Sequence, residues 1–346
     1  MSIEKPAMPE SLDLTAIADA ARRLERGELV AFPTETVYGL GADAENPLAV
    51  AKIYQAKGRP SNHPVIVHLA PEADIAYWAK DVSPEARQLI AAFWPGPLTL
   101  ILKRANHIPD TVAGGQDSIG LRCPSHPVAQ ALLRNFKQGK GGIAAPSANK
   151  FGHVSPTTAQ HVRDEFVDDT NGLLTCVLDG GQSEVGIEST IVDMSRGRAV
   201  LLRPGHISAA QIGAVLGVAP LLPDAAAPRA SGTLEAHYAP HTPVVLLERE
   251  QMHEALQQLH AHGKRVALMH HSFTATVPAA ASIFLPAQPA LYAHDLYAAL
   301  RAMDDAHADV IMVDSPPGDE AWNGVNDRLR RAAHDSSGIL LTLLQD

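Results

Sequence analysis

The chain has 346 residues, 46% of them hydrophobic and 19% charged, which is typical of a globular protein too long for one ordinary core. We therefore expect two domains of unequal size. The formal net charge of -10 disfavours a protein whose whole surface grips nucleic acid, so any anion site must be local.

The first part of the chain predicts a helix, a strand, a polar stretch and a second helix. Apolar spacing favours a surface helix at residues 14–26, a buried strand at 28–32 and a helix at 47–54. Residues 33–41, Pro-Thr-Glu-Thr-Val-Tyr-Gly-Leu-Gly, should form a strand-to-helix crossing whose hydroxyls, Tyr38 included, can contact a small ligand. A polar turn whose threonines only cap the next helix is the alternative.

Strands and helices keep alternating as far as residue 216. Strands are predicted at residues 64–69, 98–102, 118–124, 142–149, 174–179, 189–193 and 198–203, and helices at 83–93, 127–135 and 209–216. The connections vary in length and no single unit repeats. This pattern predicts an α/β layered domain with a twisted mixed sheet rather than a barrel.

The composition shifts to Ala, Pro and Ser at about residues 220–243, as in a linker. Beyond it, strands at 244–247, 265–269, 282–285 and 309–313 alternate with helices at 250–262, 292–307 and 321–334. They predict a smaller, Rossmann-like three-layer α/β domain. We thus expect a first domain at 1–219, a linker at 220–243 and a second domain at 244–346.

Four cations lie at the ends of predicted elements. Lys57 and Arg59 follow a helix, and Arg122 and Arg203 end strands and lie within two residues of a proline. Strand ends converge at one edge of a sheet, so these groups should form a common rim able to bind phosphate and carboxylate. For Lys57 and Arg59, a solvated helix C-terminus is the alternative.

Small polar side chains occur at the same kind of position. Ser147, Asn149 and Ser189 follow or open strands and could orient a ligand, although ordinary turn caps would look the same. His68 ends a strand, where it could bind a ligand or be a hydrogen-bonded structural histidine.

Several sharper motifs are absent or broken. The chain has no phosphate-binding Gly-x-x-x-x-Gly-Lys-Ser/Thr loop. The dinucleotide-like pattern at 39–44 lacks the acidic residue expected about twenty positions later. His237 and His241 have metal-ligand spacing, but Pro240 disrupts the helix that would align them, so no protein metal site is predicted.

Seven ordered segments nevertheless resemble one known family. They are residues 33–41, Lys57-Gly58-Arg59-Pro60, residues 62–68, Pro146-Ser147-Ala148-Asn149, residues 188–193, Arg203-Pro204-Gly205 and His237-Tyr238-Ala239-Pro240. Together they resemble the L-threonylcarbamoyladenylate synthases, in the long form that joins a YrdC-type catalytic domain to an additional C-terminal domain.

The resemblance implies an enzyme that makes L-threonylcarbamoyladenylate from L-threonine, bicarbonate and ATP and releases pyrophosphate. The implied partner is the downstream tRNA threonylcarbamoyltransferase machinery that completes N6-threonylcarbamoyladenosine, with direct tRNA binding left open. Mg²⁺ would arrive with ATP, held mostly by phosphates and water.

The resemblance also implies roles for single residues. Lys57 and Arg59 would form the catalytic clamp. Threonine or its carbamate would be held by Thr34, His68, Arg122, Ser147 and Ser189. ATP would be contacted by Lys57, Arg59, Ser61, Ser118, Asn149, Ser155, Arg203 and Tyr238, with Tyr238 bringing the linker over the cleft.

Two segments depart from the family pattern, so no role is carried onto them. Residues 230–236 lack the lysine and tyrosine common in the family linker, and residues 320–329 match its C-terminal segment only partly.

The rival reading is an RNA-binding module with a basic concave face and no catalysis. A carbamoyltransferase acting on another protein would need acylphosphatase and zinc-finger segments that this sequence lacks. Cys123 and Cys176, without a secretory leader pattern, favour reduced thiols in the cytoplasm. No uncharged run approaches the ~20 residues of a membrane span.

Overall fold

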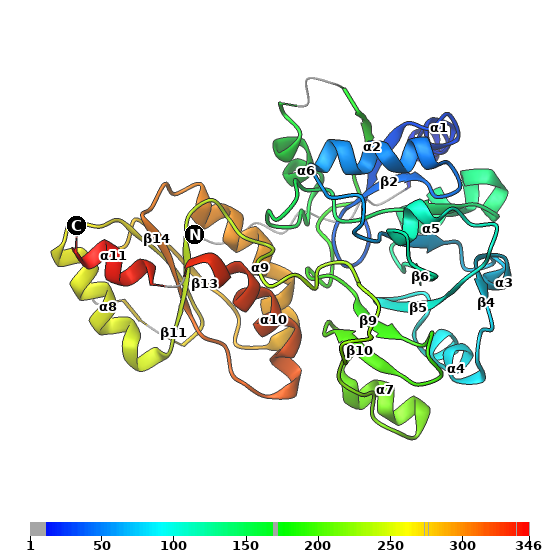
Figure 1. Ribbon diagram of the computed structural model, residues 1–346. Helices are drawn as coiled ribbons and strands as arrows, with labels where there is room; N and C mark the ends of the chain where they lie inside the picture. Colours follow the sequence, from blue (N-terminus) through cyan, green and yellow to red (C-terminus); the bar gives the residue numbers. More distant parts are fainter. Residues whose placement is uncertain (1–11, 169–171, 273, 276, 337, 346) are drawn as a thin grey trace.

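The computed structural model describes residues 12–168, 172–272, 274–275, 277–336 and 338–345. These residues form two β-sheets with their helices, an N-terminal unit and a C-terminal unit, seen at the right and left of Figure 1. The mixed α/β class, with a large twisted mixed sheet and a separate smaller sheet, is confirmed. Between helix α7 and strand β11 the backbone forms isolated bridges but no named helix or strand.

The N-terminal unit is built on a ten-stranded sheet. Its strands are β1 (Leu29–Phe32), β2 (Gly39–Asp43), β3 (Ile66–Leu69), β4 (Ala79–Lys80), β5 (Leu98–Arg104), β6 (Ser118–Arg122), β7 (Gly142–Ala144), β8 (Leu174–Val177), β9 (Thr190–Asp193) and β10 (Val200–Arg203). The order is β10-β9-β5-β6-β3-β7-β2-β1-β8, with β4 paired to β5. The sheet is mixed: β1 pairs with β8, β3 with β6 and β5 with β9 in parallel, and the other pairs are antiparallel. The strands β9, β5, β6 and β3 are neighbours in this order.

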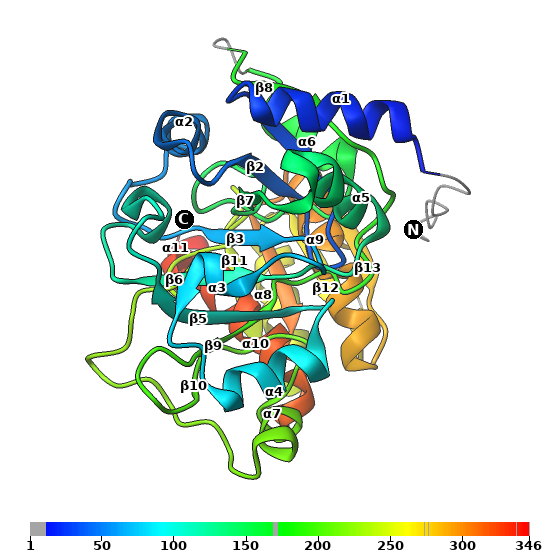
Figure 2. The ribbon, with the colours of Figure 1, turned by 90° about the vertical axis from the view of Figure 1, so that its right-hand side faces the viewer.

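The helices of this unit cover the sheet as amphipathic patterns predict. They are α1 (Leu14–Glu25), α2 (Pro47–Lys57), α3 (Ile75–Trp78), α4 (Pro84–Phe93), α5 (Pro127–Asn135), α6 (Ala159–Glu165) and α7 (Ala209–Leu216). In Figure 2, α1 and α2 lie at the top of this unit, with β8 beside α1, and α4 and α7 lie at its bottom. Polar side chains cap the helix starts, as with Asn46 before α2 and Ser208 before α7. The short elements α3, β4 and α6 were not predicted, because they hold too few residues to show a period.

One expectation in this unit is wrong: residues 33–41 are not a strand-to-helix crossing. Gly39 begins β2, which runs antiparallel to β1 with Phe32 opposite Gly39. A Cβ on Gly41 would lie 2.9 Å from the Phe32 ring and 2.8 Å from Ile143, so this glycine serves strand packing. The Tyr38 hydroxyl donates to the Gly181 carbonyl at 2.8 Å, so it makes a structural contact within the protein.

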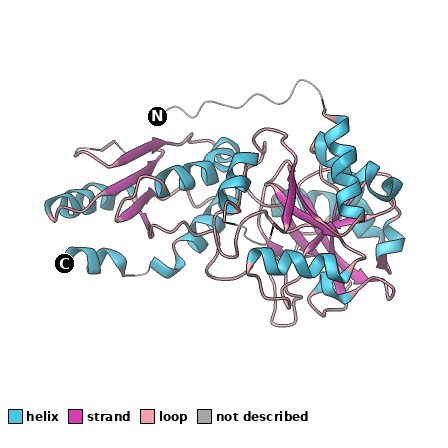
Figure 3. Ribbon diagram, turned by 90° about the horizontal axis from the view of Figure 1, so that it is seen from above, coloured by secondary structure: helices cyan, strands magenta, loops and turns pink. Residues whose placement is uncertain are grey.

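The C-terminal unit is a four-stranded parallel sheet with helices on both faces (Figure 3). Its strands are β11 (Val244–Leu247), β12 (Val266–His270), β13 (Ala281–Phe284) and β14 (Val310–Asp314), in the order β11-β14-β12-β13. Its helices are α8 (Arg249–Ala261), α9 (Pro289–Asp304), α10 (Asn323–Ala332) and α11 (Ile339–Gln345). Apolar residues of α8 and α11 share one cluster and those of α9 and α10 another, which makes three layers.

A single apolar cluster joins the two units. Val37 and Ile187 of the N-terminal unit belong to the same buried cluster as Tyr297 of α9 and Val325 of α10. The C-terminal unit therefore packs through α9 and α10 against the segments of the first unit around Val37 and Ile187. None of the described helices is both long and apolar enough to cross a membrane.

Candidate active site

One pocket collects side chains from most of the polar segments singled out in the sequence. It is lined by Thr34, Thr36, Val37, Gly39, Arg59, Ile66, His68, Arg122, Ala145, Pro146, Ser147, Glu188, Ser189, Arg203, Ser231, Gly232, His237 and Tyr238. The space open to the centre of a water molecule is about 50 Å³, so the hollow is small. The connecting segment, residues 220–243, supplies the last four of these residues and fills part of the hollow.

Arg122, at the end of β6, faces the pocket and is anchored from behind by Glu35. Its guanidinium lies 2.6 Å from the Glu35 carboxylate, donates to Thr36 Oγ1 at 2.8 Å and to the Gly96 carbonyl at 3.3 Å. Glu35 also accepts from the Ser125 backbone N–H at 3.1 Å. The contacts to Thr36 and Gly96 use two of the five guanidinium N–H groups, and the terminal nitrogen nearest Glu35 makes an ion pair but no hydrogen bond, which leaves donors for a carboxylate ligand.

His68 lies in the same wall as a neutral imidazole. Burial, reinforced by the charge of Arg122, lowers the pKa of His68 to about 3. Its Nδ1 is buried and has no hydrogen-bond partner. Because a buried polar atom without a partner costs free energy, a bound ligand that meets Nδ1 would be favoured.

Arg203, at the end of β10, ties the opposite wall to the connecting segment. Its guanidinium donates to the Ser189 carbonyl at 2.8 and 3.1 Å, and to the Ser231 carbonyl at 2.8 Å. The Ser189 hydroxyl in turn pairs with Thr99 at 2.8 Å. Gly232 must be glycine here, because a Cβ would lie 2.7 Å from Arg203 and 2.0 Å from the Tyr238 hydroxyl.

Arg59 adds a third guanidinium to the pocket. It donates to the Pro64 carbonyl at 2.9 Å and to the Ser231 hydroxyl at 3.4 Å, while its Nε is buried with no partner. Burial lowers the pKa of Arg59 to about 10. Three buried arginines around one hollow are the charge pattern that an anionic ligand would neutralise.

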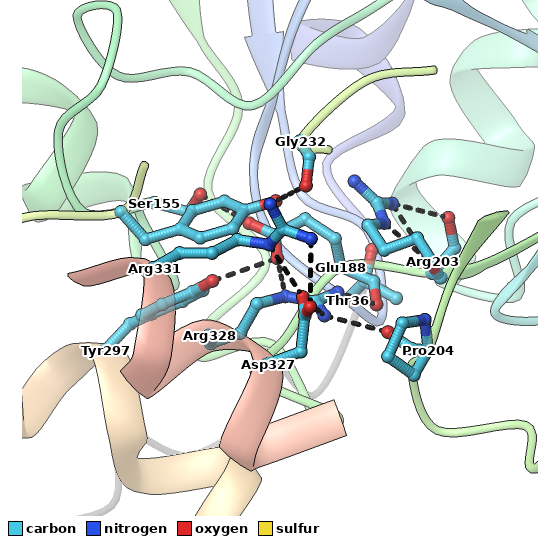
Figure 4. A network of polar contacts seen from close by, with 12 residues as sticks. Thr36, Ser155, Glu188, Arg203, Pro204, Gly232, Tyr297, Asp327, Arg328 and Arg331 are labelled. Carbon is cyan, nitrogen blue, oxygen red and sulfur yellow. Dashed lines mark hydrogen bonds and ion pairs between the residues drawn. The ribbon is translucent and has the colours of Figure 1, made fainter. Parts of the chain in front are cut away.

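Glu188 is the one carboxylate in the pocket wall, and donors surround it (Figure 4). Its carboxylate accepts from Ser155 at 2.5 Å, from Tyr297 at 2.9 Å and from Arg328 at 2.8 Å. Arg328 and then Arg203 hold the pKa of Glu188 down, to about 2, against the opposing effect of burial. Glu188 is therefore ionised at neutral pH.

Not every residue expected in the site lines the pocket. Lys57 is buried behind it, where its ammonium donates to the Ser147 carbonyl at 2.6 Å and to the Asn149 carbonyl. Burial lowers the pKa of Lys57 well below its usual value. Ser118 and Asn149 are buried away from the lining, and Ser155 points at Glu188. Ser61 is exposed.

Sequence reasoning missed the residues that position these groups. Glu35 and Glu188 lie inside the family-like segments, next to Thr34 and Ser189. That position was the one sign in the sequence that they lie near the site. Ser231 and Arg328 come from the two segments that depart from the family pattern. Ser231 lines the pocket and Arg328 lies behind Glu188, and the sequence offered no sign of either contact.

The described residues contain no group of three or more His, Cys, Asp or Glu side chains placed to hold a metal ion. His237 is buried, and burial lowers its pKa to about 3. Cys123 and Cys176 are both free thiols, so no bond joins them.

Two family models cover most of the chain. Residues 22–205 match the Sua5, YciO and YrdC model, described as telomere recombination, and residues 207–334 match the model described as threonylcarbamoyl-AMP synthase, C-terminal domain. The threonylcarbamoyl-AMP synthase of Pyrococcus abyssi is 36% identical over 94% of this chain and 96% of its own. That of Bacillus subtilis is 39% identical over 92% of each.

The fold agrees with a solved relative. The crystal structure of P. abyssi Sua5 complexed with L-threonine matches with a TM-score of 0.85 and 35% identity, over 94% of this chain and 96% of that one. Both units are included in this match. The chain belongs to the threonylcarbamoyl-AMP synthase family, in the form that carries a C-terminal domain after the YrdC-type domain.

Proposed function

We propose that this protein makes L-threonylcarbamoyladenylate from L-threonine, bicarbonate and ATP and releases pyrophosphate. The observation that carries the proposal is the convergence of Arg59, Arg122 and Arg203 on one buried pocket with neutral His68 beside them. Family membership supports the same activity.

The chemistry needs charge neutralisation and alignment rather than a protein nucleophile. The threonine amine and bicarbonate give a carbamate with loss of water. A carbamate oxygen then forms a bond to the α-phosphorus of ATP while the bond to pyrophosphate breaks. Both partners are anions, so a pocket of fixed guanidinium groups lowers the barrier by reducing their repulsion and holding them in line.

The positions of the side chains suggest a division of the pocket. Arg122 would pair with the threonine carboxylate, with Thr34, His68, Ser147 and Ser189 around the rest of the amino acid or its carbamate. Arg59 and Arg203 would face the phosphates, and Tyr238 would cover the nucleotide. Lys57 uses two of its three N–H groups to hold the Ser147–Asn149 turn, which leaves one for a phosphate.

Other parts of the proposal rest on the resemblance. Four of the residues proposed to contact ATP do not line the pocket, so ATP would have to extend beyond it to meet them: Ser61, Ser118, Asn149 and Ser155. Mg²⁺ would neutralise the phosphates, bound mainly by ATP and water, because Glu35 and Glu188 are already paired with arginines. The product would pass to a tRNA threonylcarbamoyltransferase in the cytoplasm.

The division of labour along the chain belongs to the same proposal. Residues 1–219 would carry catalysis, residues 220–243 would act as the linker over the cleft, and residues 244–346 would form the accessory domain.

The test is pyrophosphate release from ATP by the purified chain. We expect release only when L-threonine and bicarbonate are both present, together with a product that has the mass of threonylcarbamoyl-AMP. Release that persists when either is omitted would remove the proposal.

The rival, an RNA-binding module, fits the geometry less well. The side chains of Arg59, Arg122 and Arg203 are nearly inaccessible, with 7%, 4% and 2% of their residue surfaces exposed, so a polynucleotide backbone could not lie along them.

A further inference from the structure

Arg328 of α10 reaches from the C-terminal unit to Glu188 and lies behind the wall of the active-site pocket. It is fully buried. Its Nε lies 2.8 Å from the Glu188 carboxylate, and its terminal nitrogens donate to the Glu188 carbonyl at 3.0 Å and the Pro204 carbonyl at 2.8 Å. One side chain thus binds both strand-end segments that carry Ser189 and Arg203 (Figure 4).

The same guanidinium also lies over the ring of Tyr238, 5.5 Å from its centroid. Tyr238 has a φ of 62°, a left-handed conformation that is strained for a tyrosine. Its ring also lies beside that of Tyr297, whose ring centroid is 5.7 Å away. The C-terminal unit therefore fixes the residue through which the connecting segment covers the pocket.

Two features of α10 make this reach possible. Gly324 lets the helix start against the first unit, since a Cβ there would lie 2.9 Å from Ile187 and 3.2 Å from the Gly205 carbonyl. Asp327 lies beside Arg328 at 3.0 Å and is itself held by Arg331 at 3.0 Å. Arg328 is therefore oriented by its own unit before it meets Glu188.

The charges explain what this contact does. Glu188 lines the pocket together with Arg203, and the two charges attract. With Arg328 in place, the Glu188 carboxylate already has a cationic partner behind the pocket, so Arg203 remains available to bind a ligand. Without Arg328, Arg203 would be the cation left to pair with Glu188.

We propose that Arg328 is a positioning residue that holds Glu188 away from Arg203, so that the C-terminal unit completes the phosphate-binding wall of the site. This inference rests on the proposed function in one respect, namely that Arg203 faces the phosphates of ATP. It gives the C-terminal unit a specific task in ATP binding rather than in threonine binding.

The test compares three variants of the full-length chain. Arg328→Met removes the charge and keeps the side-chain length. Arg328→Met with Glu188→Gln removes both charges, so no carboxylate at position 188 can pair with Arg203 in place of ATP. Arg330→Met is the matched control, because Arg330 is on the same helix and also binds Asp327 at 3.0 Å but is exposed and makes no contact with Glu188.

We expect Arg328→Met to raise KM for ATP by about tenfold and KM for threonine by less than about twofold. The double variant should bring KM for ATP back to within about threefold of the parent value. Arg330→Met should leave both constants within about twofold. If Arg328 had only a structural role, adding Glu188→Gln would not lower KM for ATP, because a second buried substitution would disturb the packing further.

Affinity for a non-hydrolysable ATP analogue, measured by calorimetry, separates this inference from the proposed function. If the parent chain binds the analogue but makes no product, the proposed function fails, and the order of affinities among the variants still decides the role of Arg328. An unchanged ATP affinity in Arg328→Met, a double variant no better than the single one, or a parent chain that does not bind the analogue would overturn the inference.

Discussion

Two buried pairs of a carboxylate and a guanidinium flank the pocket, and they face it in opposite directions. In the first, Arg122 lines the pocket and Glu35 stands behind it. In the second, Glu188 lines the pocket and Arg328 stands behind it. In our proposal the first pair presents a cation to the ligand, whereas the second keeps a carboxylate from pairing with the neighbouring Arg203.

The two pairs also differ in how they are assembled. Glu35 and Arg122 both come from the N-terminal unit, through the loop after β1 and the end of β6. Glu188 and Arg328 come from different units, so the second pair forms only when α10 packs onto the first unit. The comparison teaches that one type of interaction can select a ligand or brace a wall, depending on which partner is exposed to the pocket.

The largest effect that would test the difference between the two pairs comes from removing the cation of the first pair. We expect Arg122→Met to lower kcat/KM for threonine by about 1000-fold, about 4 kcal/mol, because the carboxylate ligand loses its partner and Glu35 is left buried without its own. Arg134→Met is the control, since Arg134 makes an exposed ion pair with Glu72. A threonine KM unchanged in Arg122→Met would mean that Arg122 does not face the amino acid.

The carboxylate of the second pair, Glu188, should make the free energy of unfolding depend on pH in the acid range. The pKa of Glu188 is about 2 in the folded chain and 4.5 when unperturbed, so its contribution is complete above pH 4.5 and is lost as the pH falls toward 2. Glu188→Gln should cost about 3 kcal/mol of unfolding free energy at pH 7. Urea unfolding at pH 7, 4 and 3 checks this, with the gap between parent and variant narrowing as the pH falls. A gap that does not change with pH would contradict it.

The protonation of His68 tests how buried the surroundings of the first pair are. Its pKa is about 3 in the folded chain against 6.5 unperturbed, so the unfolded state takes up a proton first as the pH falls below 6.5. Stability should therefore drop by about 2 kcal/mol between pH 6.5 and 5 through this group, and His68→Gln should lose that part of the drop. Equal pH slopes for both proteins would show that His68 is charged or accessible in the folded state.

The smallest effect is expected outside both pairs. Ser61 is exposed and does not line the pocket, so Ser61→Ala should raise KM for ATP by no more than about threefold. Ser189→Ala, in the pocket wall, should instead raise KM for threonine by more than that factor. A larger loss in Ser61→Ala would show that ATP extends over this surface when it binds.

Much of this molecule follows from the order of its residues. Apolar periodicity, proline and capping side chains located α2, α4, α5 and α9 to within a few residues, because these signals act between neighbours along the chain. The same reasoning located Arg59, Arg122 and Arg203 at the ends of elements and expected them to meet. The pocket brings those three together.

Only the tertiary structure decided which side chains stand behind those groups. Residues 33–41 enter a strand rather than a helix, because Gly41 must pack flat against Phe32 and Ile143, which lie elsewhere in the sheet. Arg328 joins Glu188 across 140 residues, and Ser231 joins Arg203 across 28. Such contacts depend on how the connecting segment and the C-terminal unit dock onto the first sheet, and spacing along the chain carries no record of that docking.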